Sequence, residues 1–194
     1  MHICGVILAG GKSSRMGTNK SLLPINGKPT IQHIAEELQK ITKDIIIISN
    51  HPSDYDFLPF KIYEDRFLDK GPLAGIESAL YYQPADLYLF AACDMPFIQA
   101  DIYQLLLANM EDNDVIIPKY EERIHPLAGI YRKTVLPYVQ QQLSKDDLKV
   151  RRLFDYLKVK YVGDYPEIAG EILTKHFFNM NKPEEYQKAL KYKE

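Results

Sequence analysis

Short apolar runs alternate with segments of helical period along the chain. The runs Ile3–Ala9, Ile45–Ile48 and Leu87–Ala92 are apolar at every position. Between the first two, residues 31–41 place apolar side chains on one face at the 3.6-residue spacing of a helix, with Pro29 expected in its first turn. A strand that is apolar throughout is covered on both faces, which is typical of a parallel sheet sandwiched by helices.

The remaining segments continue this order. Shorter apolar runs predict further strands at Phe60–Tyr63, Val115–Ile117 and Leu127–Tyr131. The last of these is expected to reverse direction after a turn at Tyr120–Arg123. Helices are predicted from Pro72, around Ile102, Leu105, Leu106 and Met110, and, after another helix and strand, from about Pro183. The pattern predicts an α/β fold, a Rossmann-like, doubly wound and mostly parallel sheet flanked by helices, in one domain over residues 1–194.

Composition narrows the class of protein. The 194 residues include 24 Lys and Arg and 26 Asp and Glu, and the two signs are interspersed, so no basic stripe favours nucleic acid or a membrane surface. No apolar run reaches the roughly 18 residues that a membrane span needs, and no secretion signal begins the chain. Cys4 and Cys93 are too far apart in sequence for a CxxC motif and are expected to be buried, free thiols. We therefore expect a cytoplasmic protein.

A glycine-rich loop follows the first strand, at the carboxyl edge where open parallel sheets bind ligands. Gly10, Gly11 and Gly17 allow backbone N–H groups to approach an anion closely. Arg15 and Lys20 add two cations, which a triphosphate would neutralise. The loop therefore predicts a site for a polyphosphate.

Three better-known motifs do not account for this loop. A Walker A loop ending in Gly11-Lys12-Ser13 would need glycine at position 6, which is Val6. The glycines also lack the G-x-G-x-x-G spacing of a dinucleotide fingerprint. The Asn-Lys-x-Asp guanine motif of small GTPases would need an aspartate at Leu22.

Two aspartates follow predicted strands at the same edge. Asp94 comes after Leu87–Ala92, and Asp65 comes after Phe60–Tyr63. A carboxylate at the end of a buried strand is costly unless a cation pairs with it. Mg²⁺ takes one or two protein carboxylates and completes its shell with water and phosphate oxygens, so Asp94 is a candidate ligand. The structural alternatives are a turn residue at Asp94 and a turn cap at Asp65.

Residues 8–20, with the pattern L-A-G-G-x-S-x-R-M-G-x-x-K, resemble the signature loop of nucleotidyltransferases that activate sugars, polyol phosphates and molybdopterin. Further segments make the chain similar to the molybdenum cofactor guanylyltransferase (MobA) family: Gly71–Gly75, Cys93–Pro96, His125–Gly129 and Asn179–Tyr186. The likeness extends over nearly the whole chain and implies a fold of the nucleotide-diphospho-sugar transferase type.

The resemblance also implies an activity, the transfer of GMP from GTP to the terminal phosphate of molybdopterin with release of pyrophosphate. Molybdenum-insertion and cofactor-delivery proteins would be its partners. The residues implied to contact GTP are Leu8, Ala9, Gly10, Gly11, Lys20, Asp65 and Asp94, with Asp94 also on Mg²⁺. Asn179 and Asn181 are implied to lie near the pterin, although Asn181 as a helix N-cap with Glu184 as its partner is an equally good interpretation.

The expected mechanism needs no general base, because the attacking phosphate monoester is mostly ionised at neutral pH. Arg15, Lys20 and Asp94 with its metal form the catalytic set. Two other functions remain open. A cytidylyltransferase acting on the same pterin tends to carry Leu-Ala-Ala-Gly, whereas Gly11 here favours guanine. A non-catalytic GTP-binding protein could use the same fold.

Overall fold

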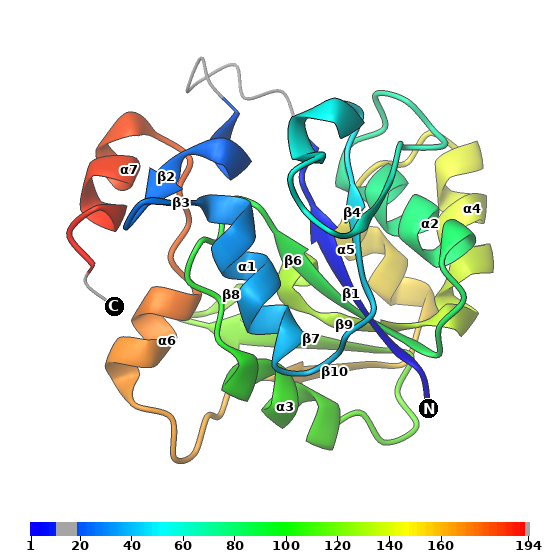
Figure 1. Cartoon of the computed structure of the whole chain (residues 1–194). Coiled ribbons are helices and arrows are strands. Elements are labelled where there is room, and N and C mark those ends of the chain that lie inside the picture. Colours follow the sequence, from blue (N-terminus) through cyan, green and yellow to red (C-terminus); the bar gives the residue numbers. More distant parts are fainter. Residues whose placement is uncertain (11–18, 193–194) are drawn as a thin grey trace.

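The computed structural model describes residues 1–10 and 19–192, which form a central sheet with helices on both faces (Figure 1). The strands of the sheet, in spatial order, are β10 (Val159–Val162), β7 (Val115–Tyr120), β9 (Ile130–Arg132), β6 (Leu87–Ala92), β1 (Ile3–Leu8), β4 (Ile45–Ile48) and β5 (Lys61–Tyr63). Strand β9 runs antiparallel to both of its neighbours, and the other pairs along this order are parallel. The order reverses at β1, so the predicted doubly wound topology is confirmed.

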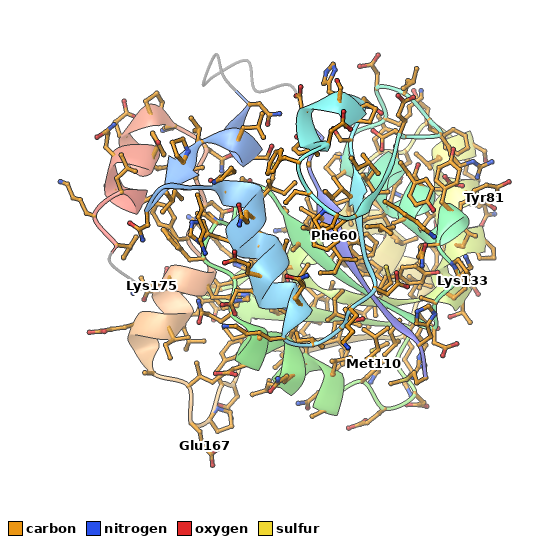
Figure 2. The ribbon with its side chains drawn as sticks, in the orientation of Figure 1. Phe60, Tyr81, Met110, Lys133, Glu167 and Lys175 are labelled. Carbon is orange, nitrogen blue, oxygen red and sulfur yellow. The ribbon has the colours of Figure 1, made fainter. Side chains whose placement is uncertain are left out.

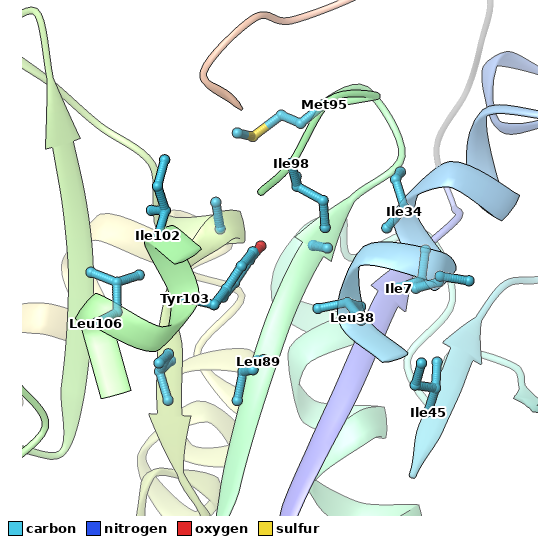
Figure 3. Packing of buried hydrophobic residues seen from close by; sticks show 14 of the residues in the cluster. Ile7, Ile34, Leu38, Ile45, Leu89, Met95, Ile98, Ile102, Tyr103 and Leu106 are labelled. Carbon is cyan, nitrogen blue, oxygen red and sulfur yellow. The ribbon is translucent and has the colours of Figure 1, made fainter. Parts of the chain in front are cut away.

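The two faces of the sheet are covered by different helices. On one face lie α1 (Thr30–Gln39) and α3 (Ala100–Ala108), and on the other lie α2 (Pro72–Tyr82), α4 (Leu136–Ser144) and α5 (Val150–Leu153) (Figure 1). Alternation along β1 assigns Ile7 to the first core and Val6 and Leu8 to the second. Figure 3 shows the first core, in which Ile7 and Leu89 of the sheet meet Ile34 and Tyr103 of the helices. Strands β1, β4 and β6 are thus buried on both faces, as their continuous apolar runs predict.

Several predicted boundaries are wrong by a few residues. Pro29 is the residue before α1 and not part of its first turn, and Met110 lies beyond the end of α3. The strand predicted from Leu127 begins only at Ile130, because Pro126–Ala128 form a 3₁₀ turn. The backbone there passes so close to β7 that a Cβ at Gly129 would lie 2.6 Å from the Ile116 carbonyl oxygen. The reversal itself is confirmed, with β8 (Arg123–Ile124) returning along the end of β7.

A small second sheet, which the periodicity did not predict, packs against the C-terminal helix. Its strands β2 (Pro24–Ile25) and β3 (Lys28–Pro29) are joined by Asn26 and Gly27, both at positive φ. Asn-Gly is the preferred pair for such a tight hairpin. Ile25 packs with Met180 and with Ala189 of α7 (Pro183–Ala189), so the chain after α6 (Gly170–His176) is fixed beside the N-terminal half. This contact is what brings the C-terminal asparagines to the edge of the main sheet.

Both cysteines are free thiols, as the sequence predicts. Cys4 is buried and Cys93 partly buried, and burial raises the pKa of each thiol to about 12. Among the described residues, no helix combines the length and the apolar composition that crossing a bilayer requires.

Candidate active site

The register of the sheet brings four strand ends into line. Leu8 of β1 is paired with Ile48 of β4 and with Ala92 of β6, and Ile48 is paired with Tyr63 of β5. The residues that follow these four positions therefore emerge at one edge of the sheet, as the sequence predicts. Leu8 and Ala9 are each only 8% exposed, while Gly10 is exposed. Gly11 and Arg15, the other predicted loop residues, lie outside the described residues.

Lys20, Asp94 and Asn181 gather at this edge from three distant parts of the chain. Lys20 begins the 3₁₀ turn η1 (Lys20–Leu22), and its Nζ donates to Oδ1 of Asn181 over 2.8 Å. The backbone N–H of Met180 donates to the Asp94 carbonyl over 2.7 Å and so joins the C-terminal segment to the turn after β6. The structure thus confirms that two of the predicted catalytic residues are neighbours.

The electrostatics of Asp94 fit a cation site. Burial raises the pKa of its carboxyl, while the Lys20 ammonium and the Asn181 side chain partly lower it and Glu185 raises it again. A carboxylate held in such surroundings is poorly solvated, and a divalent cation would stabilise its charged form. The described residues contain no group of three or more His, Cys, Asp or Glu side chains placed to hold a metal. One carboxylate with phosphate and water oxygens is nonetheless a donor set that suits Mg²⁺.

The capping of α7 differs from the interpretation of Asn181 as its N-cap. The N-cap is Lys182, one residue later, and the carboxylate of Glu185, not of Glu184, accepts the backbone N–H groups of Asn181 and Lys182 at 2.5 and 2.9 Å. The predicted proline in the first turn, Pro183, is confirmed. Because the cap is shifted, the Asn181 amide contacts Lys20 and not its own helix.

Asn179, the other asparagine of this segment, bonds to a residue close to it in sequence, whereas Asn181 bonds to the distant Lys20. Its Nδ2 donates to the Phe177 carbonyl over 2.9 Å, just after α6. Met180 between the two asparagines is fully buried, while both asparagines are partly exposed. This agrees with the alternation that predicts the two amides on one side of the segment.

A second carboxylate, Asp65, lies at the end of β5 and is paired with Asn50. The Nδ2 of Asn50 donates to Oδ2 of Asp65, and the backbone N–H of Asp65 donates back to Oδ1 of Asn50, both over 2.9 Å. Sequence reasoning left Asn50 unassigned, although its place two residues after β4 is a usable signal. This reciprocal pair fixes the orientation of the Asp65 carboxylate.

The other oxygen of that carboxylate, Oδ1, is buried and has no hydrogen-bond partner among the described residues. Burial raises the pKa of Asp65, and the Asn50 hydrogen bond offsets this only in part. A Cβ added at Gly75 of α2 would lie 3.0 Å from Leu8 Cδ2 and 3.6 Å from this oxygen. An unpaired acceptor therefore lies beside the end of β1, where a ligand with an N–H or O–H group would satisfy it.

The residue after Asp65 anchors the segment to α2. Arg66 forms an ion pair with the fully buried Glu77, with 2.5 Å between Nη1 and Oε1, and its backbone N–H donates to Ser78 Oγ over 2.8 Å. Its guanidinium also lies 3.3 Å from the ring centroid of Tyr81. Tyr81 belongs to the end of α2 and is labelled in Figure 2. Loss of Arg66 would leave the Glu77 carboxylate buried without its cation, so this pair holds the loop in place.

The chain has close relatives among known sequences. Residues 5–161 match the model of the MobA-like NTP transferase domain. A probable molybdenum cofactor guanylyltransferase of Carboxydothermus hydrogenoformans is 39% identical over 186 residues, which cover 95% of this chain and 93% of the relative. A protein of the same description from Clostridium perfringens is 38% identical over 191 residues, 97% of this chain and 96% of the relative.

Solved structures agree on the fold. Molybdopterin-guanine dinucleotide biosynthesis protein A of Archaeoglobus fulgidus superposes with a TM-score of 0.80 at 22% identity, covering 96% of each chain. CMP:2-keto-3-deoxy-manno-octonic acid synthetase in complex with CTP superposes with a TM-score of 0.75 at 18% identity, over 98% of this chain and 97% of the other. At these identities the likeness concerns the fold, and it confirms the predicted fold class.

Proposed function

The chain belongs to the MobA-like NTP transferase family, and on this basis we propose that it transfers GMP from GTP to the terminal phosphate of molybdopterin and releases pyrophosphate. As a member of this family it is a nucleotidyltransferase. The choice of guanine nucleotide and pterin is supported by the relatives from two bacteria that carry the name molybdenum cofactor guanylyltransferase at 38–39% identity.

One observation carries the proposal, namely that a cation, a carboxylate and an amide meet at the carboxyl edge of the sheet. Lys20 contacts Asn181, and both interact with Asp94. Two phosphorylated substrates repel each other, so an enzyme that joins them has to neutralise their charge at one place. Lys20 supplies one positive charge for that task, and Asp94 is a candidate ligand for a second cation.

The chain's own residues would act mainly by positioning and by electrostatics. Lys20 would lie against the phosphates of GTP and stabilise the charge that develops on the α-phosphate and on the leaving pyrophosphate. Arg15, which lies between β1 and η1 in the sequence, would share this role. Asp94 would hold Mg²⁺, which when bound neutralises phosphate charge as a Lewis acid. No general base is required, because the phosphate of the pterin is already mostly ionised at pH 7.

The guanine base would lie at the carboxyl edge of the sheet, at the point where β1 ends. We propose that Leu8, Ala9, Gly10 and Gly11 contact the base, and that Oδ1 of Asp65 accepts a hydrogen bond from the base or the ribose. Support for this comes from the unpaired, buried state of that oxygen and from its place beside Leu8. Asn50 would orient Asp65 for this contact.

The pterin would bind at the same edge of the sheet, beside the C-terminal segment of the chain that carries two asparagines. Asn179 and Asn181 are the proposed contacts, supported by the hydrogen bond that joins Asn181 to Lys20. Two cavities of about 450 and 360 Å³ lie near the carboxyl ends of β7 and β10, and both are lined by Lys119. Arg151 lines the smaller one, whereas the Lys119 ammonium is paired with Glu122 over 2.7 Å.

Turnover with different nucleotides tests this proposal. With molybdopterin and Mg²⁺ supplied, we expect pyrophosphate release with GTP to exceed release with CTP by at least about tenfold, the ratio that a 1.4 kcal/mol difference in transition-state binding gives. The same assay without the pterin is the control, and it should show no release. A preference for CTP would establish the cytidylyltransferase alternative. GTP binding without any release of pyrophosphate would establish the non-catalytic one.

A further inference from the structure

The hydroxyl of a buried tyrosine lies between the end of β1 and the turn that carries Lys20. Tyr55, the last residue of the 3₁₀ turn η2 (Pro52–Tyr55), is 0% exposed. Its hydroxyl donates to the Ala9 carbonyl over 3.2 Å and accepts from Asn19 Nδ2 over 3.0 Å. Ser21 Oγ, also fully buried, lies 2.8 Å from the same hydroxyl. One phenol thus contacts residues from both sides of segment 10–18.

The turn on the far side is itself held by this group of side chains. Asn19 caps η1, where its Oδ1 accepts the backbone N–H of Ser21 over 3.2 Å and the Ser21 hydroxyl over 2.6 Å. The Nδ2 of Asn19 donates to Asp54 of η2 as well, over 3.1 Å. Lys20 therefore stands between Asn19, which donates to the Tyr55 hydroxyl, and Ser21, whose Oγ contacts the same hydroxyl.

We propose that Tyr55 is a positioning residue of the nucleotide site. Its hydroxyl fixes the distance between Ala9, at the proposed base-binding end, and Lys20, at the proposed phosphate-binding end. A base and a triphosphate belong to one molecule, so the groups that bind them must keep a set separation for both contacts to form together. This inference rests on the proposed function, and it adds a residue that touches neither substrate.

The hydroxyl has a role that core packing does not require. A phenylalanine ring would fill the same space, so the polar group at this position serves its hydrogen bonds. Tyr103 of α3, labelled in Figure 3, is a matched case. It is equally buried, but its hydroxyl donates to a single backbone carbonyl, that of Phe90 in the middle of β6. The two tyrosines differ in what their hydroxyls connect, and only that of Tyr55 joins the two ends of the proposed site.

Comparison of Tyr55→Phe with Tyr103→Phe tests the inference by calorimetric titration of GTP in the presence of Mg²⁺. Both variants lose one buried hydroxyl, and each is expected to lower Tm by about 2–6 °C. The Kd for GTP is expected to rise at least about tenfold in Tyr55→Phe and to stay within about twofold of wild type in Tyr103→Phe. An unchanged Kd in Tyr55→Phe, or an equal rise in both variants, would overturn the inference.

A second variant keeps the test decisive if Tyr55→Phe does not fold. Ser21→Ala removes a hydroxyl of the same group and should by itself raise the Kd for GTP at least about threefold, a result that does not require Tyr55→Phe to fold. Where both single variants fold, Tyr55→Phe added to Ser21→Ala should raise the Kd by less than it does alone. Wild-type affinity in Ser21→Ala, or independent effects of the two changes, would contradict the role of Tyr55. If the wild-type protein itself fails to bind GTP, the proposed function is wrong, and the role of Tyr55 is wrong with it. Normal wild-type binding with an unaffected Tyr55→Phe overturns the positioning role alone.

Discussion

Replacement of Asp94 by asparagine is expected to lower kcat by about a thousandfold at saturating GTP, because the site loses the carboxylate proposed to hold Mg²⁺ and with it several kcal/mol of transition-state stabilisation. Asparagine has nearly the same shape as aspartate but no negative charge. Steady-state pyrophosphate release over a range of Mg²⁺ concentrations measures the effect. The Mg²⁺ concentration required for half-maximal rate should rise together with the loss of kcat.

Folding should survive this replacement. Burial raises the pKa of Asp94, which means that the folded protein disfavours the charged carboxylate relative to the unfolded chain. Near neutral pH that charge therefore costs stability, and the Asp94→Asn variant without metal should keep or exceed the wild-type Tm. The same raised pKa predicts weaker Mg²⁺ binding to the wild type as the pH falls through it, since protons compete with the metal.

Asp86 offers a matched control, because it precedes β6 while Asp94 follows it. Asp86 is exposed, and its Oδ2 accepts the backbone N–H of His2 over 2.7 Å, a bond that an asparagine side chain can also accept. Asp86→Asn should therefore leave kcat and its Mg²⁺ dependence unchanged. Equal rates for Asp94→Asn and wild type would show that the Asp94 carboxylate is not the ligand of a catalytic metal ion.

Replacement of Lys20 by alanine is the second large expected effect, a fall in kcat of about a hundredfold or more. The estimate follows from the loss of a charged group worth roughly 3–4 kcal/mol in the transition state, by analogy with an oxyanion-hole donor. The variant should fold, because the Lys20 side chain is only partly buried and its Nζ makes a single described hydrogen bond, to Asn181. Single-turnover measurements of GMP transfer separate this loss from slower product release.

Lys28→Ala serves as the control for the charge itself. Lys28 is exposed on β3, and its ammonium pairs with the Glu36 carboxylate over 3.0 Å. An exposed pair of this kind contributes little, so the rate should match that of the wild type. If Lys20→Ala transfers GMP as fast as Lys28→Ala, the proposed role of Lys20 is wrong.

Most of the central fold could be predicted from hydrophobic pattern alone. Ile45–Ile48 and Leu87–Ala92 are strands with those bounds, because residues buried on both faces leave an unbroken apolar run. The β2–β3 hairpin could not be predicted in this way, because a strand of two residues is too short to show an alternation of apolar and polar positions. Its Asn26-Gly27 pair was the available signal.

The site could be predicted in outline but not in its connections. Strand ends and chemistry pointed to Lys20, Asp65 and Asp94, and the structure places all three at one edge of the sheet. The partners Asn50 and Tyr55 were not assigned, because a hydrogen bond across 15 or 46 residues depends on tertiary packing. The cap of α7 was misplaced by one residue for a similar reason. Adjacent Asn-Lys and Glu-Glu pairs fit two registers, and the structure distinguishes them by the hydrogen bonds to Glu185 and by the contact of Asn181 with Lys20.

A crystal structure of the protein with Mg²⁺ and a GTP analogue that cannot be cleaved between its α- and β-phosphates would test most directly whether this edge binds the nucleotide for reaction. The expected result is a metal ion on the Asp94 carboxylate, phosphates against Lys20, and the guanosine beside Leu8 with a donor on Oδ1 of Asp65. A nucleotide bound at another surface, or a metal ion that leaves Asp94 uncoordinated, would contradict the proposed site.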